Sequence, residues 1–418
     1  MIQDPIEIMS PVGSPESLSA AIQAGADAVY FGVGNLNMRA RSTVNFTLND
    51  LARITGRCRR HGIKSYLTVN TIIYPEEMAE VERLLQRAKA CGVTAVIASD
   101  WAVITRAAAL GLPVHASTQC NITNLEAVRF FARYANVMVT ARELNLKQLQ
   151  AITEGIRRER ITGPDGKPVR IEIFVHGALC MAVSGQCYLS LDNLGSPANR
   201  GACLQPCRRQ YEVRDADNEL ELLVSGKYIL SPKDLCTIGF LDKILQAGVS
   251  VLKIEGRGRS PEYVKSVTEC YKEAVEACRD GSYGEEKVKG WMQRLQNVYN
   301  RGFWEGRYLG RRMGEWTERY GSQARKTKIH IGTVTNYFSR LQVAEIKVEN
   351  DRLQVGDELM VTGPTTGVAE TLLEEIRVEL QSVEKAEKGT LCSIPVHGKV
   401  RRNDKVYRLI PACDSEDY

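Results

Sequence analysis

The sequence predicts an α/β fold built on a TIM-type (β/α)8 barrel that spans residues 1–280. Eight short apolar runs occur in the first 260 residues, and amphipathic patterns such as Glu76–Ala90 separate most of them. Apolar strands flanked by such helices indicate a parallel sheet buried on both faces, and eight of them suit a barrel of about 250 residues. An open doubly wound sheet is the alternative, but no glycine fingerprint follows the first run. The expected strands are Ile6–Met9, Ala28–Val33, Ser65–Asn70, Ala95–Ser99, Pro113–Ser117, Val137–Thr140, Ile171–Val175 and Val251–Glu255.

The length of 418 residues allows two or three domains, and the net charge of +5 does not by itself indicate a nucleic-acid partner. No apolar run approaches the roughly 18 residues of a membrane helix, and the first residues lack the pattern of a signal peptide. We therefore expect a cytoplasmic protein without a membrane span. Because thiols stay reduced in that compartment, the twelve cysteines indicate metal binding or catalysis rather than disulfides.

Polar residues recur where the expected strands end, which is where the reacting groups of a barrel enzyme lie. Any one of them could be a loop or helix-cap residue, but their recurrence at the same end of successive strands favours a pocket. These residues include Asn70, Gln119, Arg142, Glu143, His176, Glu255 and Arg257.

A long insertion over residues 177–240 follows the seventh expected strand and holds five cysteines. They are Cys180, Cys187, Cys203, Cys207 and Cys236, separated by six, fifteen, three and twenty-eight residues. Thiolates bind zinc or an iron–sulfur cluster. Structural zinc sites usually offer two closely spaced pairs, whereas only one such pair exists here, so the irregular spacing favours a cubane cluster. Buried free thiols are the alternative.

Residues 281–328 form a basic and aromatic segment, with eleven Lys and Arg against five Asp and Glu. Basic side chains meet phosphates while aromatic rings stack on bases, so this helical linker suits single-stranded RNA. The alternative is a linker that packs its aromatic rings on the barrel. From residue 329 to 418 the apolar residues alternate with a period of two, which predicts a small C-terminal β-barrel domain.

Several motifs resemble the U32 family, whose members have long been labelled peptidases or collagenases. They are His176-Gly-Ala-Leu-Cys180, Ser184-Gly-Gln-Cys187, Asn199-Arg-Gly-Ala-Cys203-Leu-Gln-Pro-Cys207 and Leu252-Lys-Ile-Glu-Gly-Arg257. The resemblance covers nearly the whole chain and implies oxygen-independent hydroxylation with a [4Fe–4S] cluster. In the RNA-directed branches it also implies dependence on prephenate. The chain is most similar to the branch that makes 5-hydroxyuridine at the wobble position of tRNA, and the ribosomal RNA cytidine branch stays open.

The resemblance also implies the cluster ligands, and the polar strand ends supply the candidates for substrate binding and acid–base chemistry. The cluster ligands that match the family's commonest set are Cys180, Cys187, Cys203 and Cys236, with Cys207 as a fifth candidate. Arginine binds carboxylates through two hydrogen bonds, so the two carboxylates of prephenate need such side chains. The substrate-binding candidates are Arg39, Asn70, Gln119, Arg142 and Arg257. The acid–base candidates are His115, His176, Glu143 and Glu255.

Two other functions are weighed against RNA hydroxylation. A peptidase is disfavoured because the sequence lacks both a His-Glu-x-x-His pair and a Gly-x-Ser-x-Gly elbow. A dyad of Cys180 and His176 is conceivable, but a cysteine that binds iron cannot also attack a carbonyl. A noncatalytic RNA-binding protein with a structural cluster is disfavoured because a scaffold does not need polar strand ends.

Overall fold

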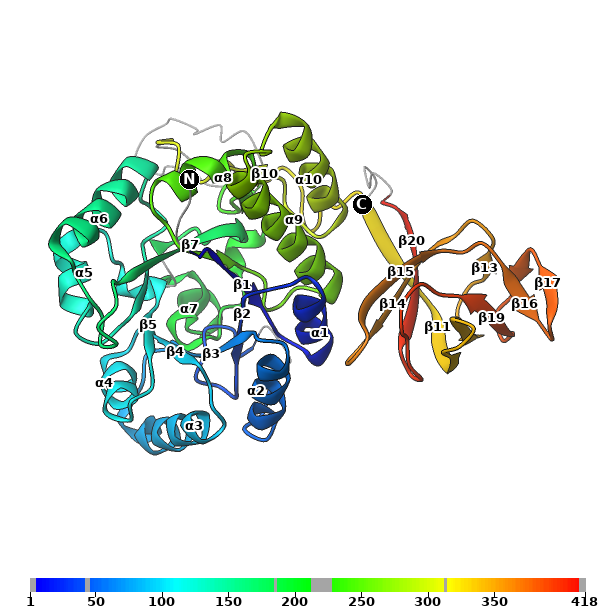
Figure 1. Cartoon of the computed structure of the whole chain (residues 1–418), viewed down its shortest axis with the longest axis horizontal. Coiled ribbons are helices and arrows are strands. Elements are labelled where there is room, and N and C mark those ends of the chain that lie inside the picture. Colours follow the sequence, from blue (N-terminus) through cyan, green and yellow to red (C-terminus); the bar gives the residue numbers. More distant parts are fainter. Residues whose placement is uncertain (1–4, 42–45, 184–185, 212–227, 312–313, 413–418) are drawn as a thin grey trace.

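The computed structural model describes residues 5–41, 46–183, 186–211, 228–311 and 314–412. Eight parallel strands form a closed barrel, because the last of them pairs with both the seventh and the first. The predicted TIM-type fold and all eight predicted strands are thereby confirmed (Figure 1). The strands are β1 (Glu7–Pro11), β2 (Ala28–Gly32), β3 (Lys64–Val69), β4 (Ala95–Ala98), β5 (Val114–Ala116), β6 (Val137–Val139), β7 (Arg170–Gly177) and β9 (Val251–Ile254).

Helices surround the barrel in the order that a (β/α)8 fold requires (Figure 1). Side-chain caps fix several helix starts: Ser14 accepts a hydrogen bond from the Ser17 amide, and Asp100 accepts one from the Ala102 amide. The helices are α1 (Pro15–Gln23), α2 (Asp50–Arg60), α3 (Met78–Ala90), α4 (Trp101–Ala109), α5 (Leu125–Phe131), α6 (Leu146–Glu159), α8 (Leu241–Gln246), α9 (Pro261–Asp280) and α10 (Glu285–Asn297).

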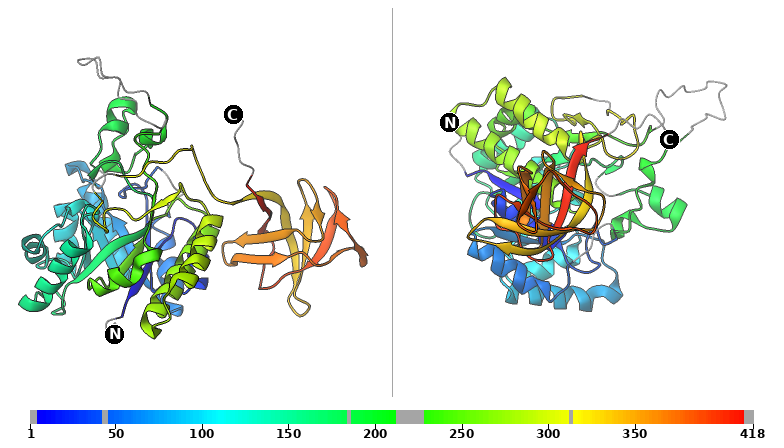
Figure 2. Two further views of the ribbon diagram at one scale, coloured as in Figure 1. Left: turned by 90° about the horizontal axis from the view of Figure 1, so that it is seen from above. Right: turned by 90° about the vertical axis from the view of Figure 1, so that its right-hand side faces the viewer.

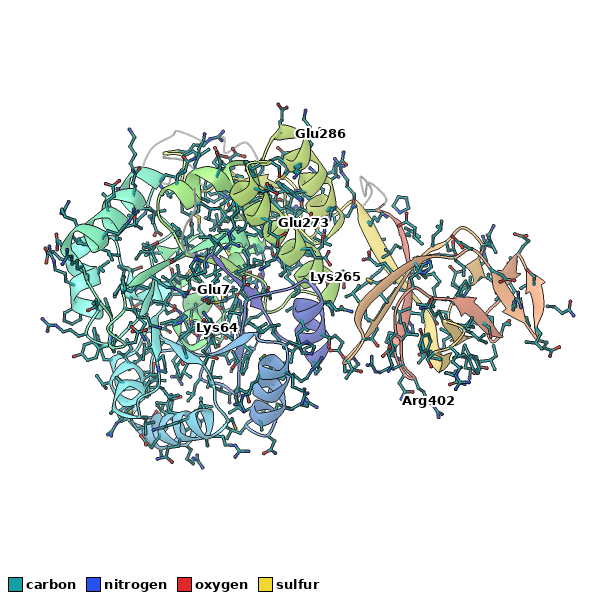
Figure 3. All side chains as sticks on the ribbon, viewed as in Figure 1. Glu7, Lys64, Lys265, Glu273, Glu286 and Arg402 are labelled. Atoms are coloured by element: carbon teal, nitrogen blue, oxygen red, sulfur yellow. The ribbon has the colours of Figure 1, made fainter. Side chains whose placement is uncertain are left out.

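The amino end of the barrel is closed by an ion-pair network around Glu7. This buried carboxylate accepts hydrogen bonds from Lys64, Tyr66 and Arg170 at 2.6, 2.6 and 2.8 Å. Figure 3 shows Glu7 and Lys64 side by side near the barrel axis. Because each oxygen of Glu7 has a partner, the charge is tolerated at only 4% exposure of the residue.

The cysteine-rich insertion projects from the opposite, carboxyl end of the barrel (Figure 2). It contains the short helix α7 (Leu189–Leu194) and the strand β8 (Asp234–Cys236). β8 runs antiparallel to β7 and places Cys236 opposite His176, so the insertion returns to the barrel sheet before α8 begins.

Among the described residues of segment 281–328, α10 is the only helix, and the chain then turns to the short strand β10 (Phe303–Trp304), which pairs with β8. Three of its aromatic side chains, Trp291, Trp304 and Tyr308, are buried, and the Tyr308 hydroxyl donates to the Phe174 carbonyl at 2.7 Å. These rings therefore pack on the barrel, as the alternative to RNA stacking expects. The Tyr320 ring is 73% exposed.

A C-terminal β domain follows, with its own apolar core. Its main sheet has the order β15-β14-β20-β11-β12-β19-β16-β17. The predicted C-terminal β domain is thereby confirmed, and in its described part no strand pairing joins the edges β15 and β17. The alternation of apolar residues indicates which side chains face the core, but it does not determine which strands pair with each other. The strands are β11 (Lys326–Phe338), β12 (Val343–Val348), β13 (Leu353–Gln354), β14 (Glu358–Gly363), β15 (Gly367–Leu372), β16 (Ile376–Val378), β17 (Gln381–Val383), β18 (Lys385–Ala386), β19 (Leu391–Pro395) and β20 (Lys405–Pro411).

The β domain packs against α1 through the hairpin of β14 and β15. Gln23 on α1 donates to the Thr366 carbonyl at 2.6 Å and accepts from the Val368 amide at 2.9 Å. Among the described residues, no helix combines the length and the apolar character needed to cross a bilayer.

Candidate functional site

A cavity of about 240 Å³ lies at the carboxyl ends of the barrel strands, between the barrel and the cysteine-rich insertion. The structure gathers most of the predicted site residues around it. The predicted residues that line the cavity are Arg39, Asn70, Gln119, Arg142, Cys180, Cys203, Glu255 and Arg257.

The cavity wall carries a large excess of positive charge. Glu255 is the one carboxylate among the described residues that line it. The cationic lining residues are Arg39, Arg142, Arg208, Lys253, Arg257, Arg259 and Arg301. Low-dielectric walls of one charge sign concentrate ligands of the opposite sign, so the cavity suits an anion with more than one negative charge.

Arg39 and Glu255 form an ion pair of 3.0 Å inside the cavity. Burial opposes ionisation of Glu255, yet the nearby guanidinium groups, that of Arg39 above all, keep the pKa of its carboxyl below the usual range. Arg257 is buried and donates to Asn37 at 2.9 Å and to Thr68 at 2.7 Å. Both hydrogen-bond partners are neutral, which favours an anionic ligand beside Arg257.

Arg142 lies flat on the Phe174 ring, with its guanidinium carbon 3.9 Å from the ring centre. It donates to the Ala178 carbonyl at 3.2 Å, while its buried Nε has no hydrogen-bond partner among the described residues. An unpaired buried donor costs about 1–3 kcal/mol, so Arg142 is arranged to bind an acceptor from a ligand.

Lys253 also lines the cavity, although it was expected to alternate away from Glu255 and was therefore less favoured than the strand-end arginines. Its ammonium group is 2.8 Å from Glu172 and 4.6 Å from the centre of the Tyr30 ring. Lys253 is two residues before Glu255, and alternate residues of a strand point to the same face. That spacing was the available signal for placing both side chains in one cavity.

Three of the four predicted acid–base residues are not among the residues that line the cavity. His115 is buried inside the barrel, with Nδ1 3.5 Å from Glu172. Glu143 is exposed to solvent. Glu255 alone of the four is a lining residue, so the described cavity wall offers a carboxylate and no histidine for proton transfer.

His176 lies in an aromatic cage formed by Tyr263, Tyr271 and Phe303, whose ring centres are 5.4 to 5.9 Å away. The register between β7 and β9 shifts between Phe174 and His176. Two residues that are two positions apart on a regular strand point to the same face. The register shift breaks this pattern, so Phe174 faces the cavity whereas His176 packs under the insertion. Burial lowers the pKa of His176 to about 3, so its imidazole is neutral at physiological pH.

Four cysteine thiols of the insertion are close enough to influence one another. Cys180, Cys203 and Cys207 line the cavity. Burial raises the pKa of the Cys207 thiol, and the thiols of Cys180, Cys203 and Cys187 raise it further. In the described part of the chain no three His, Cys, Asp or Glu side chains are already arranged to hold a metal ion. The donor set itself, four soft sulfurs from one loop region, has the chemistry that an iron–sulfur cluster requires.

Cys236 does not belong to this group of thiols, which differs from the predicted ligand set. It is buried at the end of β8, with Sγ 3.8 Å from the sulfur of Met292, and burial raises its pKa to about 11. The pairing of β8 with β7 turns Cys236 into the apolar layer outside the barrel mouth. Cys207, the fifth candidate, takes its place beside the other three thiols.

Comparison with known proteins connects this site to a family. A family model described as peptidase family U32 matches residues 13–318. A protein named collagenase from Porphyromonas gingivalis (strain ATCC BAA-308 / W83) is 58% identical over 403 residues, which cover 96% of this chain and 97% of that protein.

Two further relatives carry names of RNA modification. The tRNA hydroxylation protein P1 of Bacillus subtilis (strain 168) is 31% identical over 395 residues, which cover 90% of this chain and 89% of that protein. The 23S rRNA 5-hydroxycytidine C2501 synthase of Escherichia coli (strain K12) is 36% identical over 276 residues, which cover 65% of this chain and 39% of that protein. The names of the three relatives point to enzymes but differ in the reaction.

Proposed function

This chain belongs to peptidase family U32, and from that premise we propose that it hydroxylates RNA, making 5-hydroxyuridine at the wobble position of tRNA. In this proposal the reaction needs no dioxygen, uses prephenate as co-substrate and requires a [4Fe–4S] cluster. The observation that carries the proposal is the cavity at the barrel mouth, where cysteine thiols adjoin an excess of guanidinium groups.

Prephenate is the anion that this cavity would bind. It has two carboxylates, and the hydrogen bonds that Arg142 and Arg257 donate go to a backbone carbonyl, an amide and a hydroxyl rather than to a carboxylate. Glu255 is kept ionised by Arg39, so it would accept a hydrogen bond from the ring hydroxyl of prephenate. Asn70 and Gln119 are neutral lining residues that would orient the same ligand through their amides.

Cys180, Cys187, Cys203 and Cys207 would hold the [4Fe–4S] cluster, which supplies one-electron redox chemistry when bound. Arg208 supports this assignment because it links the loops that carry the thiols. Its guanidinium donates to the Leu179 carbonyl at 2.6 Å and to the Pro232 carbonyl at 2.9 Å. Arg208 directly follows Cys207 and Leu179 directly precedes Cys180, so the hydrogen bond between them holds the two cysteine-bearing loops together.

An unpaired nucleotide suits the mouth of such a cavity, because a wobble base is single-stranded and can leave its stack. Exposed rings that could receive bases occur on the insertion and on the linker, at Tyr188 (72% exposed) and Tyr320 (73% exposed). Hydroxylation of a 23S rRNA cytidine by the same chemistry is the second candidate, and it rests on the relative whose name contains that reaction.

A peptidase is the third candidate, because a relative at 58% identity is named collagenase. The site gives it little support. A cysteine nucleophile needs a lowered thiol pKa and a neighbouring base. Burial instead raises the pKa of Cys203 and Cys207, and no histidine occurs among the described lining residues.

The deciding experiment is mass spectrometry of nucleosides from a strain that lacks the gene, complemented with variants. We expect 5-hydroxyuridine to disappear from tRNA and to return with the wild type and with Arg53→Ala, which changes an exposed arginine of α2. Arg257→Ala should restore little of the 5-hydroxyuridine.

Loss of 5-hydroxycytidine from 23S rRNA would select the second candidate. Unchanged nucleosides together with lost collagen digestion would reverse the ranking in favour of the peptidase. Unchanged nucleosides with retained RNA binding would favour a noncatalytic protein.

A further inference from the structure

Lys253 is the one primary amine among the described residues that line the cavity. Its residue is only 4% exposed, and its side chain passes between the rings of Tyr30 and Phe174, with Nζ 4.6 and 5.4 Å from their centres. The Nζ atom is 2.8 Å from Oε1 of Glu172. A buried amine at the wall of a ligand cavity is chemically different from the arginines beside it, because an amine can form a covalent bond with a carbonyl group.

We propose that Lys253 is a covalent binding site for a 2-oxo acid, whose keto carbon condenses with the Lys253 amine to form an iminium ion. The inference rests on the proposed function for its natural ligand, because prephenate carries a pyruvyl side chain and is therefore a 2-oxo acid. The site itself is defined by Lys253, Glu172 and the flanking arginines.

The surroundings of Lys253 match both reactive parts of a 2-oxo acid. Such a molecule has a carboxylate directly beside its ketone. Arg142 and Arg257 line the same cavity as Lys253, so they are available to bind that carboxylate while the ketone faces the amine. Burial lowers the pKa of Lys253, and these two arginines lower it further, although Glu172 opposes them. The population of neutral, nucleophilic amine is thereby increased.

Glu172 and His115 provide a place for the proton that the amine must lose. Glu172 Oε1 accepts from Lys253, and Oε2 lies 3.5 Å from Nδ1 of His115. Neither Oε2 nor Nδ1 has a hydrogen-bond partner among the described residues. Two buried polar atoms that lie near each other without hydrogen-bond partners can share a proton in one step of a reaction and release it in the next.

The proposed step is balanced and involves no oxidation or reduction. The ammonium of Lys253 transfers a proton to Glu172, and the neutral amine adds to the keto carbon to give a carbinolamine. Glu172 then returns this proton to the carbinolamine hydroxyl, the carbon–oxygen bond breaks, the oxygen leaves as water, and a protonated carbon–nitrogen double bond remains. Nitrogen carries one positive charge before and after the net reaction. The buried carboxylate of Glu172 therefore remains paired, which avoids the large penalty for an isolated buried charge.

A structural ion pair is the competing explanation for Lys253 and Glu172, and covalent trapping separates the two. The anaerobically purified protein is incubated with pyruvate or with prephenate, then treated with sodium borohydride, which reduces an iminium to a stable amine. We expect one adduct per chain by intact mass with either acid. Peptide mapping of the wild-type adduct should place it on Lys253, a result that does not depend on any variant folding.

Two substitutions complete the test. Lys253→Arg keeps the charge opposite Glu172 but cannot form an iminium, so trapping should fall at least tenfold while the melting temperature changes little. Lys64→Arg, at the amino end of the barrel, should trap as well as the wild type. Absence of an adduct, or an adduct spread over surface lysines, overturns the proposal. If no specific adduct forms but the protein still supports tRNA hydroxylation, the covalent site is wrong and the proposed function stands. If trapping succeeds but loss of the gene leaves the tRNA nucleosides unchanged, the proposed RNA substrate is wrong and the covalent site stands.

Discussion

The guanidinium of Arg39 lies 3.0 Å from a carboxylate oxygen of Glu255, across the mouth of the barrel. Arg39 belongs to the chain after β2, whereas Glu255 directly follows β9, so this contact joins the first and last parts of the barrel sequence. The side chain of Glu255 is 12% exposed and that of Arg39 is 31% exposed. The pair is therefore shielded from solvent more than a surface salt bridge and less than a core one.

Arg39→Ala should weaken both folding and activity, because it leaves the buried Glu255 without its closest partner. We expect a loss of about 1–3 kcal/mol in the free energy of unfolding, below the full cost of a broken core pair because Arg39 is partly exposed. Urea denaturation measures this loss, with Arg53→Ala as the exposed control. Arg39→Lys should recover part of it. Equal stability of the alanine and lysine variants would show that the charge of Arg39 does not matter.

Cys207→Ser should remove most of the iron from anaerobically purified protein, because Cys207 lies beside the other three thiols of the insertion. Cys236→Ser should keep its iron, since its sulfur packs against Met292. Iron and acid-labile sulfide measure both, and Cys58→Ser on α2 is the control. If Cys236→Ser loses the iron and Cys207→Ser retains it, the ligand set taken from the family resemblance is the right one.

The strands and the cavity arginines were predictable because apolar runs and polar strand ends follow directly from a barrel buried on both faces. The separation of Cys236 from the other insertion thiols was not predictable. It depends on β8 pairing backwards with β7, a contact between segments that sequence spacing does not relate. His176 was misplaced for a similar reason, since one register shift in β7 reverses the face to which a residue points.

Glu7 should make stability depend on pH in the acid range. Burial opposes its ionisation, but Arg170, Lys64 and Tyr66 lower its pKa from 4.5 to about 2. A depressed folded-state pKa contributes stability that is complete above pH 4.5 and is lost as the pH falls towards 2. We expect the stability difference between wild type and Glu7→Gln to be up to about 3 kcal/mol at pH 7. It should shrink on acidification in denaturant titrations; a difference that is constant from pH 7 to 3 contradicts the network.

His176 should not supply the neutral-range ionisation of the reaction. Its pKa of about 3 means that the imidazole is already neutral at pH 5, so pH changes above that value leave it unaltered. His176→Gln should therefore leave the position of any limb between pH 5 and 8 in the pH–rate profile unchanged, even if the rate falls. A limb that disappears in this variant would assign the proton transfer to His176 after all.

The contact between Gln23 and the β14–β15 hairpin should hold the β domain against the barrel. Both ends of the Gln23 amide are used, and Gly367 lies so close that an added Cβ would be 2.2 Å from its oxygen. Gly367 also has a φ of +73°, which a side chain disfavours. Gln23→Ala should leave the Val368 amide unpaired at a cost of about 1–3 kcal/mol in docking. Gly367→Ala should displace the amide and disturb the same contact by a different route.

Limited proteolysis measures this docking, because cleavage before β11 becomes faster when the β domain separates from α1 more often. Both variants should be cut several-fold faster than the wild type, while Gln86→Ala on the far side of the barrel, in α3, should be cut at the wild-type rate. Covalent trapping with pyruvate should remain, since the cavity lies within the barrel and the insertion. Activity on whole tRNA should fall if the β domain helps to hold the RNA. Unchanged cleavage in both variants would mean that other contacts, such as Lys328 with Glu262 at 2.7 Å, suffice to fix the domain.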